Sequence, residues 1–251
     1  MKTTNNFLLC LLVTTVFSSE FLIYEGQKAK AQTFIHSAYL QIRCDDKVES
    51  FFSCGSSIIN HRLLLSAAHC VHGCRKLTAI IKLGSVNYLE GMTNSLSKYK
   101  IHEYFVRRRL ENDISLILTK ETIVFGNGAG RVALLKQPPT TPAHVAGWGQ
   151  TGDSPKTKSK KLWYAAQQIM KDKDCIDILL EKPCGTVCSR PTIKGYPNNG
   201  DSGNALVVKD YIQVGIVSYN CPPKDSSITV NTYIPHFVDW IKSTSKNMYC
   251  E

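Results

Sequence analysis

Three short stretches of the chain contain residue types that could perform nucleophilic catalysis. His69 lies within the sequence SAAHC at 66–70, Asp113 precedes an apolar run, and Ser202 lies within the sequence GDSG at 200–203. A serine hydroxyl is a poor nucleophile at neutral pH and needs a histidine that accepts its proton. That histidine in turn needs a buried carboxylate, which holds the imidazole in the correct tautomer. His69, Asp113 and Ser202 are therefore the candidate catalytic residues for hydrolysis through an acyl intermediate.

The segments around these residues are predicted to form β-strands. Short apolar or alternating runs recur at 38–42, 56–59, 77–83, 114–118, 145–148, 205–208 and 212–219. Polar or glycine-rich turns separate them, which is typical of barrels or sandwiches. The segment 122–139, rich in glycine and proline, divides the chain into similar halves, so we expect it to connect two β-barrels. Residues 235–241 begin with proline and carry apolar residues at helical spacing, which predicts a C-terminal helix.

Composition restricts the class of protein. The chain has 251 residues, of which 43% are hydrophobic and 20% are charged, and it lacks low-complexity tracts. These values exclude intrinsic disorder and fibrous folds. The chain contains ten cysteines, a number that favours an oxidising compartment.

The N-terminus has the pattern of a secretory signal peptide. A lysine at position 2 is followed by the apolar run 7–17 and by small residues at 18 and 19. This run is too short to cross a bilayer, so we expect a signal peptide at 1–19 and a secreted, extracellular product that does not span a membrane. Cys10 would leave with the signal. The alternative is a buried N-terminal helix.

The order His, Asp, Ser, with separations of 44 and 89 residues, does not fit subtilisin or the α/β-hydrolases. Over residues 23–241 the sequence resembles the chymotrypsin-like (trypsin-fold) serine proteases. Further matching segments are CGSSI at 54–58, AGWG at 146–149 and VSY at 217–219. The resemblance implies an all-β fold, with two antiparallel six-stranded β-barrels and a C-terminal α-helix. It also implies that 23–251 is one peptidase domain.

The resemblance assigns roles to individual residues. Ser202 matches the nucleophile, His69 the general base and acid, and Asp113 the carboxylate that orients the imidazole. The backbone N–H groups of Gly200 and Ser202 match the oxyanion hole, which stabilises charge that develops in the transition state. Ser218 matches the residue whose backbone aligns the substrate strand.

The matched specificity pocket departs from the trypsin pattern. Trypsins carry an aspartate at the pocket base, and Tyr196 stands at that position. The pocket walls, which are glycines in enzymes that accept large side chains, match Asn220 and Thr229. These residues predict a narrow pocket that favours a small or apolar residue before the cleaved bond and disfavours Lys and Arg. After Gly203, Asn204 stands where the family usually has glycine.

The activation segment also departs from the family. In relatives, cleavage frees an N-terminal amine that pairs with the aspartate before the nucleophile. The matching residues here are Ile23 and Asp201. Leu22 precedes Ile23, and neither Lys nor Arg lies between the signal and Ile23, so a trypsin-like activator has no site. Residues 20–22 would form a three-residue propeptide of a zymogen.

Two disulfides are implied by the resemblance. They are Cys54–Cys70, which flanks the histidine loop, and Cys175–Cys188 in the second barrel. The spacing of the remaining cysteines favours a third bridge, Cys44–Cys74, at one end of the first barrel.

The family's pocket bridge lacks its first partner, because Asn198 stands at that position. Cys221 would then pair with Cys184 or Cys250, or stay free. An odd number of cysteines remains after the signal, which requires at least one free or intermolecular thiol.

Basic residues cluster outside the catalytic segments. The net charge is +10, with clusters at 107–109 and at Lys156, Lys158, Lys160 and Lys161. The simplest interpretation is solvated loops; the alternative is a surface for polyanions, anionic membranes or acidic proteins. We expect no nucleic-acid partner, because the chain is exported and lacks nucleic-acid motifs. No metal or cofactor is expected, since paired CxxC spacing is absent and the family's calcium loop offers only Glu90.

Together these features predict a monomeric, secreted serine endopeptidase that acts on proteins or peptides. The alternative is a non-catalytic homologue that serves as a binding or cofactor protein. The three candidate catalytic residues favour the enzyme, whereas Tyr196, Asn198, Asn204 and the unusual N-terminus favour the alternative. A third interpretation is an adhesion or carbohydrate-binding module that uses the basic loops.

Overall fold

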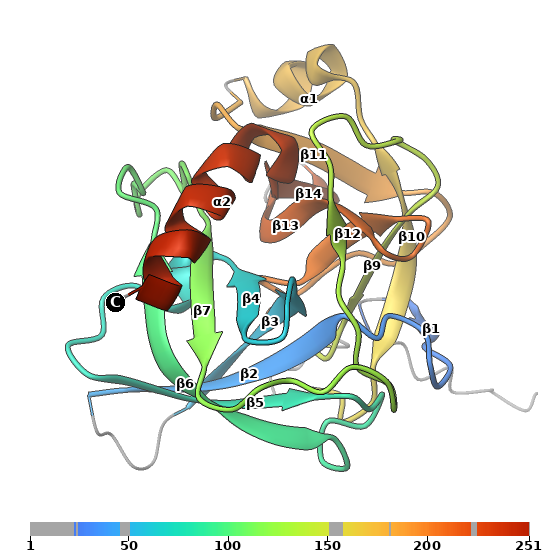
Figure 1. The fold of residues 1–251 in the computed structure, drawn as a ribbon. Helices are drawn as coiled ribbons and strands as arrows, with labels where there is room; N and C mark the ends of the chain where they lie inside the picture. The colour runs from blue at the N-terminus through green and yellow to red at the C-terminus, as the bar shows by residue number, and fades with distance from the viewer. Residues whose placement is uncertain are drawn as a thin grey trace, which may run out of the picture.

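Two rings of antiparallel strands lie side by side in the computed structural model (Figure 1), which describes residues 23, 25–45, 51–150, 158–180, 182–221 and 225–250. The first ring is closed in the order β2-β3-β4-β7-β6-β5. Its strands are β2 (Ser37–Cys44), β3 (Phe52–Ile58), β4 (Leu63–Ser66), β5 (Leu77–Leu83), β6 (Met92–Ile101) and β7 (Ser115–Thr119). Its interior is filled by aliphatic side chains, among them Leu40, Leu64 and Ile117, which are all fully buried.

The second ring is closed by the pairing of β9 with both β10 and β12. Its strands are β9 (Ala143–Gly147), β10 (Trp163–Ile169), β11 (Thr186–Pro191), β12 (Ala205–Val208), β13 (Ile212–Cys221) and β14 (Asp225–Tyr233). Two short strands, β1 (Gln27–Lys28) and β8 (Ala133–Leu134), add to β10 and β13. The prediction of an all-β fold with two six-stranded barrels is therefore confirmed.

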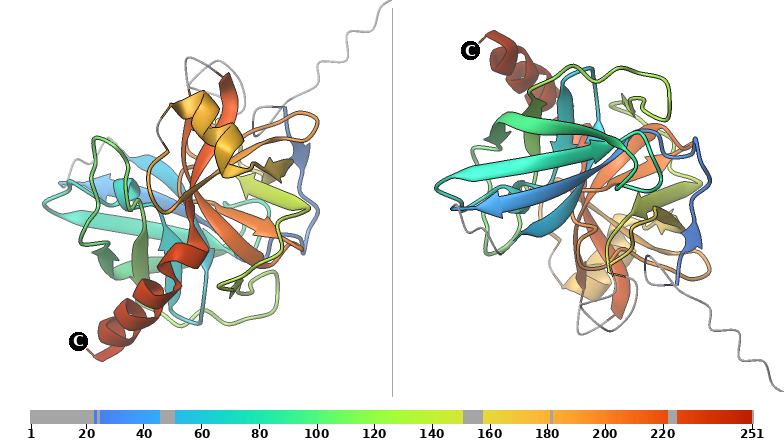
Figure 2. Two further views of the ribbon diagram at one scale, coloured as in Figure 1. Left: turned by 90° about the horizontal axis from the view of Figure 1, so that it is seen from above. Right: turned by 90° about the horizontal axis from the view of Figure 1, so that it is seen from below.

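Helices contribute little to the chain, apart from one that joins the barrels. Helix α2 (Ile234–Cys250) begins directly after β14 and runs toward the first barrel (Figure 2). Its residues Phe237, Ile241 and Met248 are buried in the same core cluster as the first barrel's aliphatic residues. The predicted C-terminal helix is thus present. Within the described residues, no helix is long and apolar enough to cross a membrane.

The apolar runs in the sequence did not predict every element of the fold. The predicted set lacks strands β1, β4, β6, β8, β10, β11 and β14 and the short helix α1 (Asp172–Leu179). Strand β6 shows the reason, because only Asn94 of its ten residues is buried. A strand whose outer face is polar carries a weak hydrophobic signal even when its backbone closes a barrel. The predicted signal peptide and propeptide, 1–19 and 20–22, lie outside the described residues.

Candidate active site

His69 and Asp113 meet at the edge of the first barrel. A short 3-10 helix (Ala68–Cys70) carries His69, and Asp113 lies just before β7. The Nδ1 atom of His69 is 2.7 Å from Oδ2 of Asp113, and the His69 backbone N–H donates to Oδ1 at 2.9 Å. The His69 side chain remains 22% exposed, whereas the Asp113 side chain is completely buried. The aspartate therefore fixes the ring while leaving its other nitrogen, Nε2, available to a partner in the cleft.

A third donor reaches the Asp113 carboxylate from the second barrel. The hydroxyl of Ser218, on β13, donates to Oδ2 of Asp113 at 2.6 Å. Thr232 on β14 donates to the Asp113 backbone carbonyl at 2.8 Å. The Ser218 hydroxyl replaces part of the hydration that the Asp113 carboxylate loses on burial. Because Ser218 and Thr232 belong to the second barrel, both hydrogen bonds also join the two barrels at this point. Sequence analysis assigned Ser218 only a backbone role and missed its side-chain contact.

Replacing Ser218 with alanine should reduce the stability of the protein. Asp113 would lose one of its three side-chain hydrogen bonds, and a poorly satisfied buried acceptor typically costs about 1–3 kcal/mol. Urea unfolding of Ser218→Ala should show a lower midpoint than the wild type, and Ser97→Ala on an exposed stretch of β6 should not. Equal midpoints for wild type and Ser218→Ala would contradict this role.

Ser202 lies in a tight turn between the two barrels. Gly200 and Gly203 adopt φ values of +95° and +90°, which residues other than glycine rarely adopt. Gly55 on β3 donates its N–H to the Ser202 carbonyl at 2.8 Å, and Gly203 donates to Val217 on β13 at 2.8 Å. These two bonds hold the turn to both barrels, so the position of Ser202 is determined by the packing of one barrel on the other.

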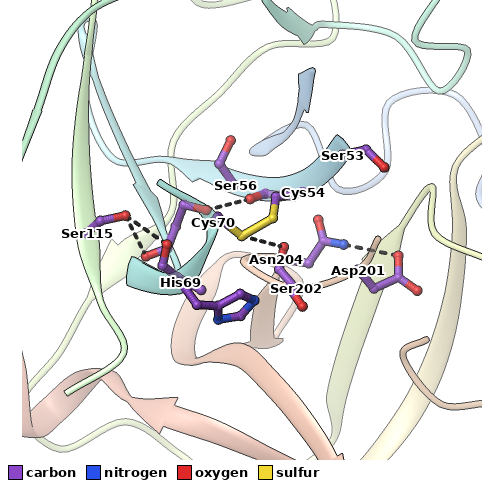
Figure 3. Close-up of a disulfide and its surroundings, with 12 residues drawn as sticks. Ser53, Cys54, Ser56, His69, Cys70, Ser115, Asp201, Ser202 and Asn204 are labelled. Carbon is purple, nitrogen blue, oxygen red and sulfur yellow. Dashed lines mark hydrogen bonds between the residues drawn. A yellow bond between two sulfur atoms is a disulfide. The ribbon is translucent and has the colours of Figure 1, made fainter. Parts of the chain in front are cut away.

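The Cys54–Cys70 disulfide lies beside both His69 and Ser202 (Figure 3). Sγ of Cys70 is 3.7 Å from the Ser202 carbonyl oxygen, and a ring nitrogen of His69 lies within 4.8 Å of the two sulfurs. In Figure 3 the His69 ring and the Ser202 side chain point the same way, away from the bridge. Because the sulfurs are bonded to each other, they are not thiolates and do not offer a metal site. The bridge instead holds the His69 segment against β3.

The backbone around Ser202 provides donors for an anion. The N–H groups of Gly200 and Ser202 make no hydrogen bond to any other described residue. Two backbone amides in one turn that have no acceptor among the described residues, next to a candidate nucleophile, are suited to a developing oxyanion. The oxyanion-hole role that the resemblance gives to Gly200 and Ser202 stays a prediction.

Asp201 points away from the cleft into the second barrel. Its carboxylate accepts hydrogen bonds from the backbone N–H groups of Gly149 at 2.8 Å and Asn198 at 3.0 Å. The amide of Asn204 donates to it at 3.2 Å. Burial raises the pKa of Asp201 to about 6, although these hydrogen bonds and the charge of Lys158 act in the opposite direction. Asn204, which the sequence marked only as a departure from the family, thus helps to hold this carboxylate.

A depression of about 450 Å³ lies beside Ser202, at the place expected for the specificity pocket. Its lining residues are Tyr196, Pro197, Asn198, Asn199, Ser202, Val217, Ser218, Tyr219 and Asn220. The amide of Asn220 crosses from β13 and donates to the Pro197 carbonyl at 2.6 Å. Thr229 lies buried next to Asn220 and donates to its Oδ1 at 3.0 Å. Asn220 therefore ties the two walls together, while Thr229 holds it from one side.

Ile23, the expected new N-terminus, is packed on the second barrel. Its side chain is 1% exposed and belongs to the barrel's core cluster. Its backbone carbonyl accepts the Gly26 N–H at 2.6 Å, and β1 follows and pairs with β10. The residue has a φ of +44°, which is unusual for a β-branched side chain.

The structure also locates the predicted disulfides and most of the residues of the two basic clusters. The bridges Cys44–Cys74, Cys54–Cys70 and Cys175–Cys188 are all present. Within the described residues, Cys184, Cys221 and Cys250 are free. The basic residues 107–109 lie in the loop between β6 and β7, where Arg109 pairs with Glu111 at 3.0 Å. Lys158, Lys160 and Lys161 precede β10, and Lys156 lies outside the described residues.

Comparisons with known proteins agree with this geometry. The chain is 30% identical over 217 residues to trypsin-1 of Astacus astacus, covering 78% of this chain and 89% of that protein. It is 29% identical over 233 residues to granzyme B of Rattus norvegicus, covering 89% and 91%. Its fold is similar to the solved structure of HL collagenase, with a TM-score of 0.77, 23% identity, and coverage of 89% of this chain and 98% of that one. The family described as Trypsin matches residues 23–241, and the chain belongs to this family of serine proteases.

Proposed function

We propose that this chain is a secreted serine endopeptidase that hydrolyses peptide bonds through His69, Asp113 and Ser202. The observation that carries the proposal is the paired His69 and Asp113, held beside the Ser202 turn, in which the N–H groups of Gly200 and Ser202 have no acceptor among the described residues. The three disulfides favour an extracellular location, because such bridges persist in oxidising compartments.

The chemistry follows from the hydrogen bonds at the site. Because Nδ1 of His69 donates to Asp113, Nε2 is the ring atom that accepts the Ser202 proton. The Ser202 oxygen attacks the scissile carbonyl, and the N–H groups of Gly200 and Ser202 stabilise the oxyanion. His69 then protonates the leaving amine, which departs and leaves an acyl-enzyme. A water molecule, deprotonated by His69, hydrolyses this ester and restores the hydroxyl of Ser202.

Labelling with a fluorophosphonate tests whether Ser202 is a reactive nucleophile. The reagent phosphonylates serines that are activated by a neighbouring base, so the secreted protein should become labelled at Ser202. Ser202→Ala should remove the label, whereas Ser97→Ala, at an exposed position on β6, should retain it. An unlabelled wild type that is folded and fully processed would contradict the proposed endopeptidase function.

A non-catalytic binding protein is the second candidate function. It is favoured by the hydrogen bond from the Asn220 amide to the Pro197 carbonyl, because this contact between the pocket walls restricts entry of a substrate side chain. This candidate predicts no labelling of Ser202 but retained binding of a protein partner. The labelling experiment therefore separates the two functions.

The pocket favours substrates with a small residue before the cleaved bond. The lining residues that the structure describes include no acidic side chain, so the charge of Lys or Arg would be buried without a counter-ion from them. The Asn220–Pro197 hydrogen bond also restricts the space for a large side chain. We therefore expect alanine-like residues to be cleaved best, and Lys and Arg to be cleaved poorly.

Asn220→Gly should widen this preference toward larger apolar residues. Removing the side chain breaks the tie to Pro197, and kcat/KM for Phe or Leu relative to Ala should rise roughly tenfold or more. The matched control Asn127→Gly changes an exposed loop residue of the same type and should leave the ratio unchanged. A library profile dominated by Lys and Arg in the wild type would show that the pocket assignment is wrong.

A further inference from the structure

Lys158 lies against the oxyanion turn, outside the specificity pocket. Its Nζ atom donates to the hydroxyl of Ser53 on β3 at 2.8 Å. Its Cε atom is 3.7 Å from the position that a Cβ on Gly200 would take, and the Ser53 hydroxyl is 3.2 Å from that position. Neither Ser53 nor Lys158 lines the pocket, which contains Asn198 and Asn199 from the other side of Gly200. Gly200 therefore separates Lys158 from the pocket.

The two sides of Gly200 receive different halves of a substrate. The residue before the cleaved bond occupies the pocket next to β13, so the residues after the bond must leave on the other side of Ser202. On that side lie the Cys54–Cys70 bridge and Ser53, which precedes Cys54 on β3 (Figure 3). A peptide that follows this direction passes the bridge toward Ser53 and Lys158.

The Lys158 ammonium has unused capacity to bind an anion. An ammonium has three N–H donors, and the hydroxyl of Ser53 accepts one of them. Among the described residues, Lys158 forms no salt bridge. The carboxylate of Asp201 contributes an electrostatic interaction, but it is buried and its oxygens are already bonded to Gly149, Asn198 and Asn204.

The Lys158 side chain is exposed, but its contact with Ser53 removes part of the hydration of the ammonium. Desolvation lowers the pKa of Lys158, with the Asp201 charge acting in the opposite direction. A cation that has lost part of its hydration gains more from an incoming carboxylate than a fully solvated one does. Its head group is also already oriented by Ser53, so less conformational entropy is lost on binding.

We infer that Lys158 is a specificity-determining residue that selects substrates with Asp or Glu at the first or second position after the cleaved bond. This inference rests on the proposed endopeptidase function. Lys158 contacts a part of the substrate that does not react, so its contribution is equal in the ground state and the transition state. It should therefore act on KM and leave kcat nearly unchanged.

Matched peptides test this selection. The peptides share one acyl half with alanine before the cleaved bond, and they carry Glu, Gln or Lys at each of the two positions after it. At one or both positions the wild type should cleave the Glu peptide with roughly three- to tenfold higher kcat/KM than the Gln peptide, and the Lys peptide least well. Lys158→Ala should abolish the difference, and Lys158→Glu should reverse it. Lys160→Ala removes a nearby exposed lysine and should retain the preference.

The outcomes also separate this inference from the proposed function. Equal cleavage of the Glu and Gln peptides, or a preference that persists in Lys158→Ala, would overturn the selection by Lys158 while leaving the endopeptidase in place. If no peptide is cleaved and Ser202 is not labelled, the proposed function itself fails. Fluorescence anisotropy with Ser202→Ala measures the binding of the same peptides without catalysis. Tighter binding of the Glu peptide than of the Gln peptide would support selection by Lys158, and equal binding would contradict that selection.

Discussion

Ser202→Ala is expected to lower kcat/KM for a peptide substrate by roughly 10⁴- to 10⁶-fold. The variant loses the only atom that can form the acyl-enzyme, so the residual rate comes from binding and from the Gly200 and Ser202 amides. The fold should be unaffected, because the Ser202 side chain lies at the cleft and the turn is held by backbone bonds to Gly55 and Val217. Steady-state hydrolysis of an alanine-containing peptide, with circular dichroism as a check of folding, measures both quantities.

The His69 variants show whether the residues act as a unit. His69→Ala should lose about as much activity as Ser202→Ala, and the double variant should be no worse than either, because each change removes the same acylation step. Ser97→Ala should remain fully active. Additive losses would show that His69 and Ser202 act independently, and equal hydrolysis by wild type and Ser202→Ala would show that the hydrolysis does not pass through this site.

Asp201→Asn should reduce kcat by roughly 10²- to 10³-fold, the usual cost of a disturbed oxyanion hole. The Asp201 carboxylate accepts from Gly149, Asn198 and Asn204, and it lies between Gly200 and Ser202 in the chain. An asparagine in its place offers one oxygen and turns an NH₂ group toward donors, so the turn should shift. Asp174→Asn, at an exposed position on α1, is the matched control and should be fully active. Full activity of Asp201→Asn would contradict this role.

The pH dependence of stability provides a second test of Asp201. Its pKa rises from 3.8 to about 6 on folding, so between these values the folded state binds more protons than the unfolded state. Stability from this group therefore falls as pH rises through that window, by a total of roughly 3 kcal/mol. Urea unfolding at pH 4, 5, 6 and 7 should show this decline in the uncleaved wild type. Relative to wild type, Asp201→Asn should lack the decline.

Cleavage before Ile23 should offset the destabilisation that comes from the buried, ionised Asp201, and it should activate the enzyme. The uncleaved chain holds Ile23 at a φ of +44°, which is unusual for a β-branched residue, and it buries Asp201 without an ion pair to any described residue. A freed Ile23 amine would supply that cation, lower the pKa of Asp201 and order the turn. If pairing raises the pKa of the amine, its stabilisation is full below the unfolded value, near 7.7–8.0, and disappears as pH rises past the folded value.

N-terminal sequencing and intact mass of the secreted protein test this activation. Protein that begins at Ile23 should be active, and protein that begins at residue 20 should gain activity on trimming to Ile23. A fully active species that still begins at residue 20 would contradict the proposed pairing of Ile23 with Asp201. The residue before Ile23 is leucine, so treatment with trypsin should not cut at this bond.

Much of the fold was predictable from local sequence. Alternating apolar runs separated by turn residues indicated strands, because one face of each barrel strand is buried and the other is not. The order and spacing of His69, Asp113 and Ser202 pointed to the family, since a nucleophile, a base and an orienting carboxylate require these residue types. Strand β6 was missed because its outward polar residues outweigh its few inward apolar ones.

The contacts that tune the site required the tertiary structure. Ser218 reaches Asp113 from 105 residues away, and Lys158 reaches Ser53 across the same number of positions. Asn220 donates to the backbone carbonyl of Pro197, and because every residue has such a carbonyl, the sequence gives no sign of this contact. Such hydrogen bonds form wherever the packing of two barrels leaves a buried donor facing an acceptor, and no periodicity in the chain records this. Residue types and their spacing therefore indicate which groups can take part in the chemistry, and the packing of the two barrels sets the hydrogen bonds, the charge environment and the solvent exposure of those groups.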